Sequence, residues 1–173
     1  MMVRLAGAML LIAGSTGMGF KAASRWREQL FLLETLRKMI HMLKGEILYA
    51  NAPLEEAFAQ VGKRNQGELG ELFVRVSGRI ESRQGEPFYE LWQEEVEQLG
   101  TEISIFSEER KQLKQFGEHL GYLDSTMQER TILLYLEQLD LSISYFREHR
   151  REKERLYPSL GVLCGLSLTI ILY

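Results

Sequence analysis

Three histidines, His41, His119 and His149, are the residues best suited to acid–base or metal chemistry near neutral pH. His41 has no further ligand three or four residues away, and His149 lies among arginines. His119 has acids nearby, because it follows Glu118 and precedes Asp124 by five residues. A pocket joining these three side chains would be the starting point for an enzyme. The spacing matches no catalytic or metal motif, and histidines at the surface explain the pattern better.

The other reactive groups also point away from catalysis. Cys164 is the only cysteine and lies in an apolar run, which excludes a disulfide framework and argues against a catalytic thiolate. The sequence contains no HxxxH, HExxH, CxxC, GxSxG, GxxxxGK or GxGxxG motif. We therefore expect no enzyme activity, no metal and no cofactor. Adjacent carboxylates are typical of solvated helix faces, and they occur at Glu94, Glu95, Glu97, Glu108 and Glu109.

Charge is distributed unevenly along the 173 residues. Residues 1–27 carry a formal charge of +4, residues 28–146 carry −9, and residues 147–173 carry +2. An acidic middle argues against nucleic-acid binding, which requires a basic face on the folded domain. Basic flanks instead suit a domain that is held at an anionic membrane by its two ends.

Residues 1–20 form an apolar stretch in which Arg4 is the one charge. As a helix this stretch is about 30 Å long, which matches the hydrocarbon thickness of a bilayer. A cleavable signal peptide is the alternative, with residues 13–15 as a small-residue cleavage site. We favour an uncleaved anchor, because the basic residues that follow at once resist translocation.

Residues 158–173 are uncharged and apolar. With Leu156 and Tyr157 they reach about 27 Å as a helix, which is short but adequate for a span. A buried core helix is the alternative, but the absence of a polar face over residues 160–172 favours a second transmembrane helix. Tyr157 and Tyr173 stand where interfacial aromatic residues belong.

Basic residues next to these two stretches set the predicted orientation, because cytoplasmic flanks are enriched in lysine and arginine. The basic residues next to each stretch predict its orientation separately, and both predictions place residues 21–157 in the cytoplasm. These residues would form a helical domain between two spans. The residues that set the topology are Lys21, Arg25, Arg27, Arg150, Arg151, Lys153 and Arg155.

Both apolar stretches carry small residues at helix-packing spacing. They predict helix–helix association, either between the two stretches or with a partner, although glycine is also simply common in membrane helices. The predicted packing residues are Gly7, Gly14, Gly17, Gly161 and Gly165, with Ala13/Gly17 and Ser15/Gly19 as further small pairs.

The middle of the chain has the 3–4 periodicity of amphipathic helices, and no segment alternates with period two. A first helix continues from the apolar stretch and ends near Asn51, with its apolar stripe at Leu33, Leu36, Ile40, Leu43, Ile47 and Ala50. Pro53 lies in the first turn of the next helix. A turn follows at residues 65–67, then helices with apolar residues over 69–80 and 88–99, the latter stopped by Gly100. We therefore predict an all-α protein with a bundle of about six helices.

Helix-start signals define the last two helices. Ser107 with acids behind it predicts the N-cap of one helix, which closes near Gly121. Asp124 or Ser125 predicts the start of the other, with Gln128 completing a capping box from Ser125. Its buried stripe is expected at Ile132, Leu136, Leu139, Ile143 and Phe146.

Four stretches carry a family resemblance: Gly7-Ala8 with Gly14-Ser15-Thr16 and Gly19-Phe20; residues 45–49 with 53–57; Phe116-Gly117 with Leu120-Gly121 and Asp124; and residues 157–165. On these residues the chain resembles stage III sporulation protein AB of endospore-forming bacteria, over essentially its whole length. Ala52 is a departure, because the family would have threonine before this proline, and it weakens a helix cap.

The resemblance implies a non-enzymatic platform in the mother-cell membrane, within the channel-like apparatus that links mother cell and forespore. It also implies a cytoplasmic domain similar to the inner-membrane platform protein of type II secretion and type IV pili. Its partners would be other channel membrane proteins, the lipid bilayer and a cytoplasmic secretion-type ATPase. The partner-contact candidates are Glu46, Tyr49, Glu55, Glu56, Phe116 and Asp124.

A membrane-tethered sensor or regulator is the alternative function. A buried cleft with convergent polar groups would favour the sensor, whereas a tightly filled bundle would not.

Overall fold

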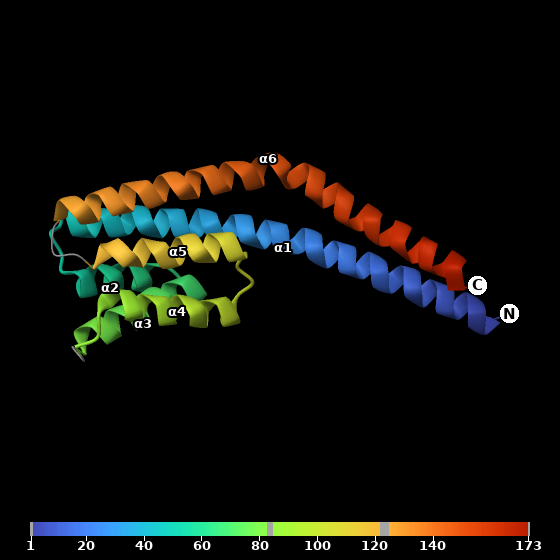
Figure 1. Ribbon diagram of the computed structural model, residues 1–173, viewed down its shortest axis with the longest axis horizontal. Helices are drawn as coiled ribbons and strands as arrows, with labels where there is room; N and C mark the ends of the chain where they lie inside the picture. Colours follow the sequence, from blue (N-terminus) through green and yellow to red (C-terminus); the bar gives the residue numbers. More distant parts are fainter. Residues whose placement is uncertain (1, 83–84, 122–124, 173) are drawn as a thin grey trace. The chain divides into compact units, whose positions relative to one another are not determined.

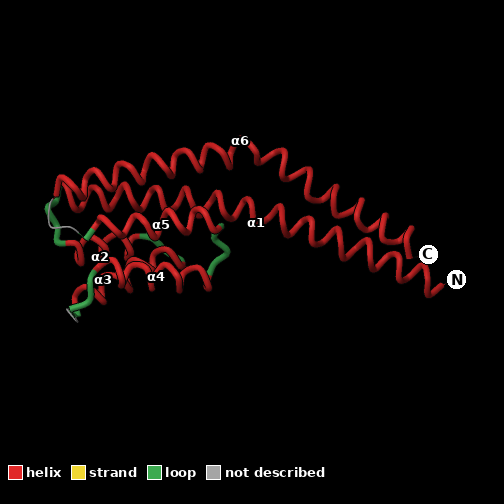
Figure 2. Tube along the Cα trace, viewed as in Figure 1, coloured by secondary structure: helices red, strands yellow, loops and turns green. Residues whose placement is uncertain are grey.

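Helices account for all the regular structure that the computed structural model describes, which covers residues 2–82, 85–121 and 125–172. Side chains are described throughout these ranges except at 2–6, 8–9, 11–12, 125, 168–169 and 171–172. Within the described residues there are six α-helices and no strand, which confirms the predicted all-α class (Figures 1 and 2). The helices are α1 (Met2–Leu48), α2 (Leu54–Arg64), α3 (Glu68–Glu81), α4 (Phe88–Glu102), α5 (Ser107–Leu120) and α6 (Ser125–Leu172).

The chain divides into two compact units, and α1 and α6 each contribute to both. One unit, the terminal unit, consists of Met1–Phe31 and Ser144–Tyr173. The other, the central unit, is the continuous segment Leu32–Ile143. The predicted domain boundaries were residues 20/21 and 157/158. The terminal unit instead extends to Phe31 and resumes at Ser144, so it also includes the basic residues next to the two apolar stretches.

The central unit has a core built from the predicted apolar stripes. On α1 the side chains of Leu33, Leu36, Ile40 and Leu43 are at most 1% exposed, as the 3–4 periodicity requires. Ala50 was predicted to belong to this stripe but is exposed, because α1 ends at Leu48. Aromatic residues from five helices, α2 to α6, fill the centre, and they are Phe58, Phe73, Trp92, Phe116 and Tyr135.

Two helix ends differ slightly from their predicted positions. The turn after α1 is made by Asn51, whose φ of 49° lies in the left-handed region. Helix α4 was expected to stop at Gly100 but continues to Glu102. The side chain of Arg110 lies against the surface of Gly100, where a Cβ would come 2.8 Å from its guanidinium.

The predicted N-cap of α5 was wrong by one residue, and the predicted cap of α6 lies partly outside the described residues. Ser107 is the first residue of α5, and Phe106 stands at the N-cap position without a side-chain hydrogen bond. Gln128 donates a hydrogen bond from Nε2 to the carbonyl of Leu120 (3.1 Å), so its side chain joins the start of α6 to the end of α5. Asp124 lies outside the described residues, as does the side chain of Ser125.

In the terminal unit, α1 and α6 lie side by side, and α6 continues through Pro158 without interruption (Figure 1). The Trp26 indole on α1 donates a hydrogen bond to the carbonyl of Phe146 on α6 (3.1 Å), and the two rings pack 4.5 Å apart. Further along, the Ser15 hydroxyl donates to the carbonyl of Gly161 (2.6 Å). The two chain ends therefore form a helical pair.

Among the residues whose side chains are described, no helix combines the length and apolar character that crossing a membrane requires. This finding does not support the transmembrane helices predicted at residues 1–20 and 158–173. Both predicted stretches lie partly outside the described side chains.

Candidate functional site

Close approach of the two terminal helices occurs at small residues. A Cβ at Gly161 would lie 2.6 Å from the carbonyl oxygen of Ser15, and a Cβ at Gly19 would collide with the carbonyl of Tyr157. In contrast, a Cβ at Gly14 or Gly17 would meet nothing within 4 Å. Ser15 and Gly19 on α1 and Gly161 on α6 thus mark the contact between the two helices within this chain.

The other two predicted packing glycines also belong to the terminal unit. Gly7 is half-buried and Gly165 is buried. The prediction that these glycines pack inside a membrane remains a prediction.

Eight basic residues, which we call the basic collar, follow the first predicted span and precede the second. Part of the collar is engaged inside the protein. Arg27 and Arg150 both contact the carboxylate of Glu154, at 3.6 and 3.0 Å. The ammonium of Lys153 lies 5.6 Å from the Trp26 ring centre and 6.0 Å from that of Tyr157. The collar consists of Lys21, Arg25, Arg27, Arg147, Arg150, Arg151, Lys153 and Arg155.

Four other members of the collar have exposed side chains and occupy one face of each helix. Lys21 and Arg25 are four residues apart on α1, and Arg151 and Arg155 are four residues apart on α6. Residues at this spacing are neighbours on a helix surface. The collar therefore presents two pairs of cations to its surroundings.

The partner-contact candidates around the α1–α2 turn have different environments. Glu46 is largely buried and accepts a hydrogen bond from Arg64 (3.0 Å), so it fastens α1 to α2. Tyr49 is 79% exposed. Glu55 is half-buried, and Glu56 is exposed and accepts a hydrogen bond from Gln60 (3.1 Å). Tyr49 and Glu56 are thus the members of this group that a partner could reach directly.

Phe116 is a core residue and not a surface residue. Its side chain is 3% exposed, stacks on Tyr135 at 4.6 Å and packs edge-on against Trp92 at 5.7 Å. Its role as a partner contact was predicted from the resemblance, and its burial leaves it no surface for a partner. Asp124 lies outside the described residues.

The candidate catalytic histidine lies at the edge of a shallow hollow. His119 and Glu118 are both exposed and line a hollow of about 240 Å³ together with Tyr135 and Gln138. The third predicted member, Asp124, is not described. No group of three or more potential metal ligands occurs among the described residues.

A cluster of charges between α3 and α4 was missed in the sequence. Glu95 was predicted to belong to a solvated face, but it is 5% exposed. Its carboxylate forms ion pairs with Arg75 at 2.8 Å and with Arg79 at 3.2 Å. Arg79 also contacts Glu94 and Glu86, at 2.9 and 2.7 Å. Glu95 directly precedes Val96, which belongs to the buried stripe of α4. This position beside the stripe could have indicated in the sequence that Glu95 is buried.

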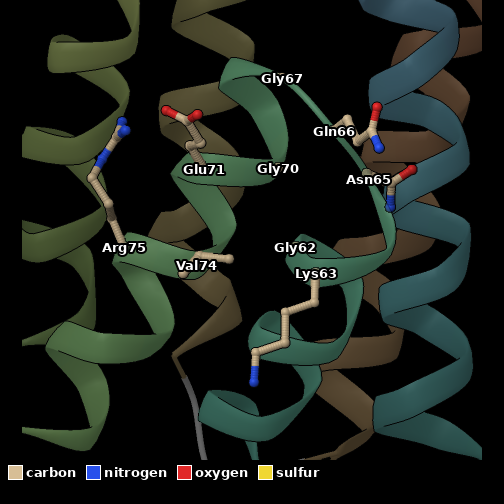
Figure 3. A pocket seen from close by; sticks show the side chains of 9 residues that line it. All are labelled: Gly62, Lys63, Asn65, Gln66, Gly67, Gly70, Glu71, Val74 and Arg75. Carbon is tan, nitrogen blue, oxygen red and sulfur yellow. The ribbon is translucent and has the colours of Figure 1, made fainter.

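A further hollow lies on the surface between α2 and α3 (Figure 3). It has a volume of about 560 Å³, and Val74 projects into it from α3 towards Gly62. The two helices approach closely there, since a Cβ at Gly62 would lie 2.8 Å from the carbonyl oxygen of Gly70. Polar side chains at its rim come from both helices and the turn, and they are Lys63, Asn65, Gln66, Glu71 and Arg75.

Glu109 and Tyr135 are ionisable groups in the bundle whose pKa values are raised. Burial raises the pKa of the Glu109 carboxyl, and the nearby Glu108 carboxylate contributes in the same direction. Burial also raises the pKa of Tyr135, with a further contribution from Glu109. Burial is the largest cause of both shifts, so both reflect packing in the bundle.

Comparison with known proteins agrees with the sequence resemblance. The family described as stage III sporulation protein AB matches residues 4–173. Stage III sporulation protein AB of Bacillus subtilis (strain 168) is 29% identical over 171 residues, covering 99% of both chains. A solved structure of stage III sporulation protein AB is similar with a TM-score of 0.66 and 26% identity, covering 72% of this chain and 98% of that one.

Proposed function

Because the chain belongs to the stage III sporulation protein AB family, we propose that it serves sporulation as a non-enzymatic membrane scaffold. In this proposal residues 1–20 and 158–173 are membrane helices, and residues 21–157 form a helical domain in the cytoplasm. The scaffold belongs to the mother-cell membrane, in the secretion-like channel complex between mother cell and forespore. Its role in the sporulating cell follows from the family, and its place in the membrane is the proposal.

The pairing of α1 with α6 is the observation that carries this proposal. The apolar ends of the chain are far apart in sequence, yet Ser15 donates a hydrogen bond to Gly161 and Gly19 lies against Tyr157. Small residues that allow close backbone contact are the usual means by which membrane helices associate. Two helices paired in this way enter a bilayer from the same side, as the basic residues at their inner ends predict.

The filled core supports a scaffold over a sensor. Trp92 is fully buried, and its indole donates a hydrogen bond to the carbonyl of Leu113 (2.7 Å). The hollow between α2 and α3 and the hollow beside His119 are open at the surface and are not buried clefts. A ligand that switches the packing would need such a cleft. No observation favours the sensor or an enzyme in particular.

The proposed partners are other membrane proteins of the channel and a cytoplasmic secretion-type ATPase. The turn between α1 and α2 is the proposed contact surface, because Tyr49 is a large aromatic side chain exposed to 79%. Exposed aromatic residues are enriched at protein interfaces. Glu56 lies on the first turn of α2 and adds charge to this surface.

Fractionation of sporulating cells tests the membrane assignment. We expect the full-length protein to stay with membranes after carbonate washing. We also expect an external protease to digest residues 21–157 only when it is admitted to the cytoplasm. Release of the protein by carbonate, or digestion of its middle from outside intact cells, would exclude the proposed topology.

Co-purification from mild detergent tests the partner assignment. Tyr49→Ala should reduce recovery of the channel subunits and the ATPase, whereas Tyr89→Ala, which removes an exposed tyrosine from α4, should not. Recovery of the wild-type protein without any of these proteins would argue against a scaffold.

A further inference from the structure

We infer that three cations of the basic collar, Lys21, Arg151 and Arg155, bind the headgroups of anionic phospholipids. This inference rests on the proposed anchoring of residues 1–20 and 158–173 in a bilayer. It goes further than anchoring, because it assigns a lipid class and separates collar residues that bind lipid from those that hold the protein together.

Six of the eight collar residues fall into these two groups according to what their side chains contact. Arg27 and Arg150 share the carboxylate of Glu154, and Lys153 lies over the rings of Trp26 and Tyr157. These three cations are engaged within the terminal unit. Arg27 and Arg150 are exposed as well, but Lys21, Arg151 and Arg155 combine exposure with the lack of an ion pair among the described residues.

Acidic residues in the same region leave a positive balance. Glu154 is neutralised by its two arginines, and Glu28 accepts a hydrogen bond from Ser24 (2.7 Å). Glu148 and Glu152 are exposed on α6. The eight cations of the collar outnumber these four acids, so an excess of positive charge remains for an external anion.

The distance of these three cations from the predicted membrane spans indicates which anion they bind. Lys21 comes directly after the first predicted span, and Arg155 stands three residues before the second. At about 1.5 Å per helical residue both side chains fall within one Debye length (about 8 Å at physiological salt) of the membrane surface. Arg151 follows one helical turn further out. Phosphate headgroups are the anions concentrated at that depth.

Energy transfer from the only cysteine can test the inference in the full-length protein. Cys164 is exposed on the protein and faces lipid in the proposed topology, so it is labelled with a donor fluorophore in detergent before reconstitution into phosphatidylcholine bilayers. Acceptor-labelled phosphatidylglycerol or acceptor-labelled phosphatidylcholine, with the label on the acyl chain, is then added as a minor component. Flotation with the vesicles and resistance to carbonate first confirm insertion, which tests the anchoring separately.

We expect transfer to phosphatidylglycerol to exceed transfer to phosphatidylcholine. Each of the three cations should contribute up to about fivefold to the local enrichment of the anionic lipid. The excess should be lost in the triple variant Lys21→Gln, Arg151→Gln, Arg155→Gln. It should persist in the matched variant Lys38→Gln, Lys111→Gln, Arg130→Gln, which removes three cations from the central unit.

Salt gives a second readout. The excess should shrink at about 1 M salt, where the Debye length is about 3 Å. Equal transfer to both lipids in an inserted wild-type protein would overturn the lipid assignment and leave the anchoring intact. An equal loss in the matched variant would also overturn it, because net charge and not the collar would then be responsible. Failure to insert would instead contradict the proposed membrane scaffold.

Discussion

At the scale of single residues, Gly117 makes room for the largest side chain in the core. A Cβ at this position of α5 would collide with the indole of Trp92. The indole, which belongs to α4, donates its hydrogen bond to the carbonyl of Leu113, which lies on α5 like Gly117. Glycine in a helix interior normally lowers stability relative to alanine, so its presence here reflects the space that Trp92 requires.

Gly117→Ala should therefore destabilise the protein by about 1–3 kcal/mol through overpacking. Gly78→Ala is the matched control, since Gly78 lies inside α3 with nothing within 4 Å. It should be neutral or stabilise by up to about 1 kcal/mol. Denaturant unfolding followed by tryptophan fluorescence measures both changes, and equal effects of the two substitutions would contradict the packing of Trp92 on Gly117.

Glu109 gives a pH dependence with a defined sign. Because burial raises its pKa in the folded state, the unfolded chain ionises first as pH rises above about 4.3, and stability falls through this window. Glu109→Gln should therefore stabilise the protein at neutral pH and have no such effect below about pH 4. Unfolding curves across this range measure the difference.

Glu108→Gln is the control for this pH dependence, because Glu108 is exposed in the same turn of α5. It should leave stability unchanged or slightly lower at neutral pH, since it removes an acid from the first turn of a helix. A stabilising effect of the same size for both variants would refute the role of burial at Glu109.

At the scale of elements, the contact between α3 and α4 combines apolar packing with a shared carboxylate. Glu95 receives guanidinium groups from both Arg75 and Arg79 while it is almost fully buried. When one partner of a buried ion pair is removed, the remaining charge stays buried without its counter-charge. The resulting loss of folding free energy exceeds the contribution of an ion pair at the protein surface. The two helices are therefore held in a fixed register by these three side chains.

Glu95→Gln should destabilise the protein by about 1–3 kcal/mol, because the two arginines lose the negative charge between them. Glu94→Gln changes the preceding residue, whose side chain is 66% exposed and forms an ion pair with Arg79. Its effect should stay within about 0.5 kcal/mol. Thermal or urea unfolding of both variants decides this, and a Glu95→Gln variant as stable as wild type would show that the cluster is dispensable.

At the scale of the whole molecule, the central unit has the properties of an independent domain. It is continuous in sequence from Leu32 to Ile143 and contains the filled aromatic core. The terminal unit, in contrast, is assembled from both ends of the chain. Folding of the centre thus depends on contacts that lie entirely within one segment.

A polypeptide of residues 32–143 should therefore fold without detergent as a helical domain. We expect a single cooperative urea transition with a slope of about 1–3 kcal/mol per molar. Trp92→Ala in the same polypeptide should abolish or strongly weaken the transition, because it leaves a large cavity in the core. A non-cooperative transition of the parent polypeptide would mean that the terminal helices are required for folding.

The amino-acid sequence alone determined the helical class, the number of helices and most of the buried stripes. These features are local, because a helix repeats every 3.6 residues and its apolar face can be counted along the chain. Leu33, Leu36 and Ile40 were predicted correctly for this reason. The predicted cap at Ser107 was wrong by one residue, since helix termini depend on backbone angles that a side-chain preference only biases.

Tertiary structure alone decided which residues meet across helices. The burial of Glu95 between Arg75 and Arg79, the burial of Phe116 and the contact of Gly19 and Gly161 with the opposite helix depend on which elements become neighbours. From the sequence alone, a charged residue beside an apolar stripe is predicted to be solvated. Whether a second helix covers it depends on the tertiary structure. Helix periodicity assigns a residue to a face, whereas the packing of helices distant in sequence decides what that face touches.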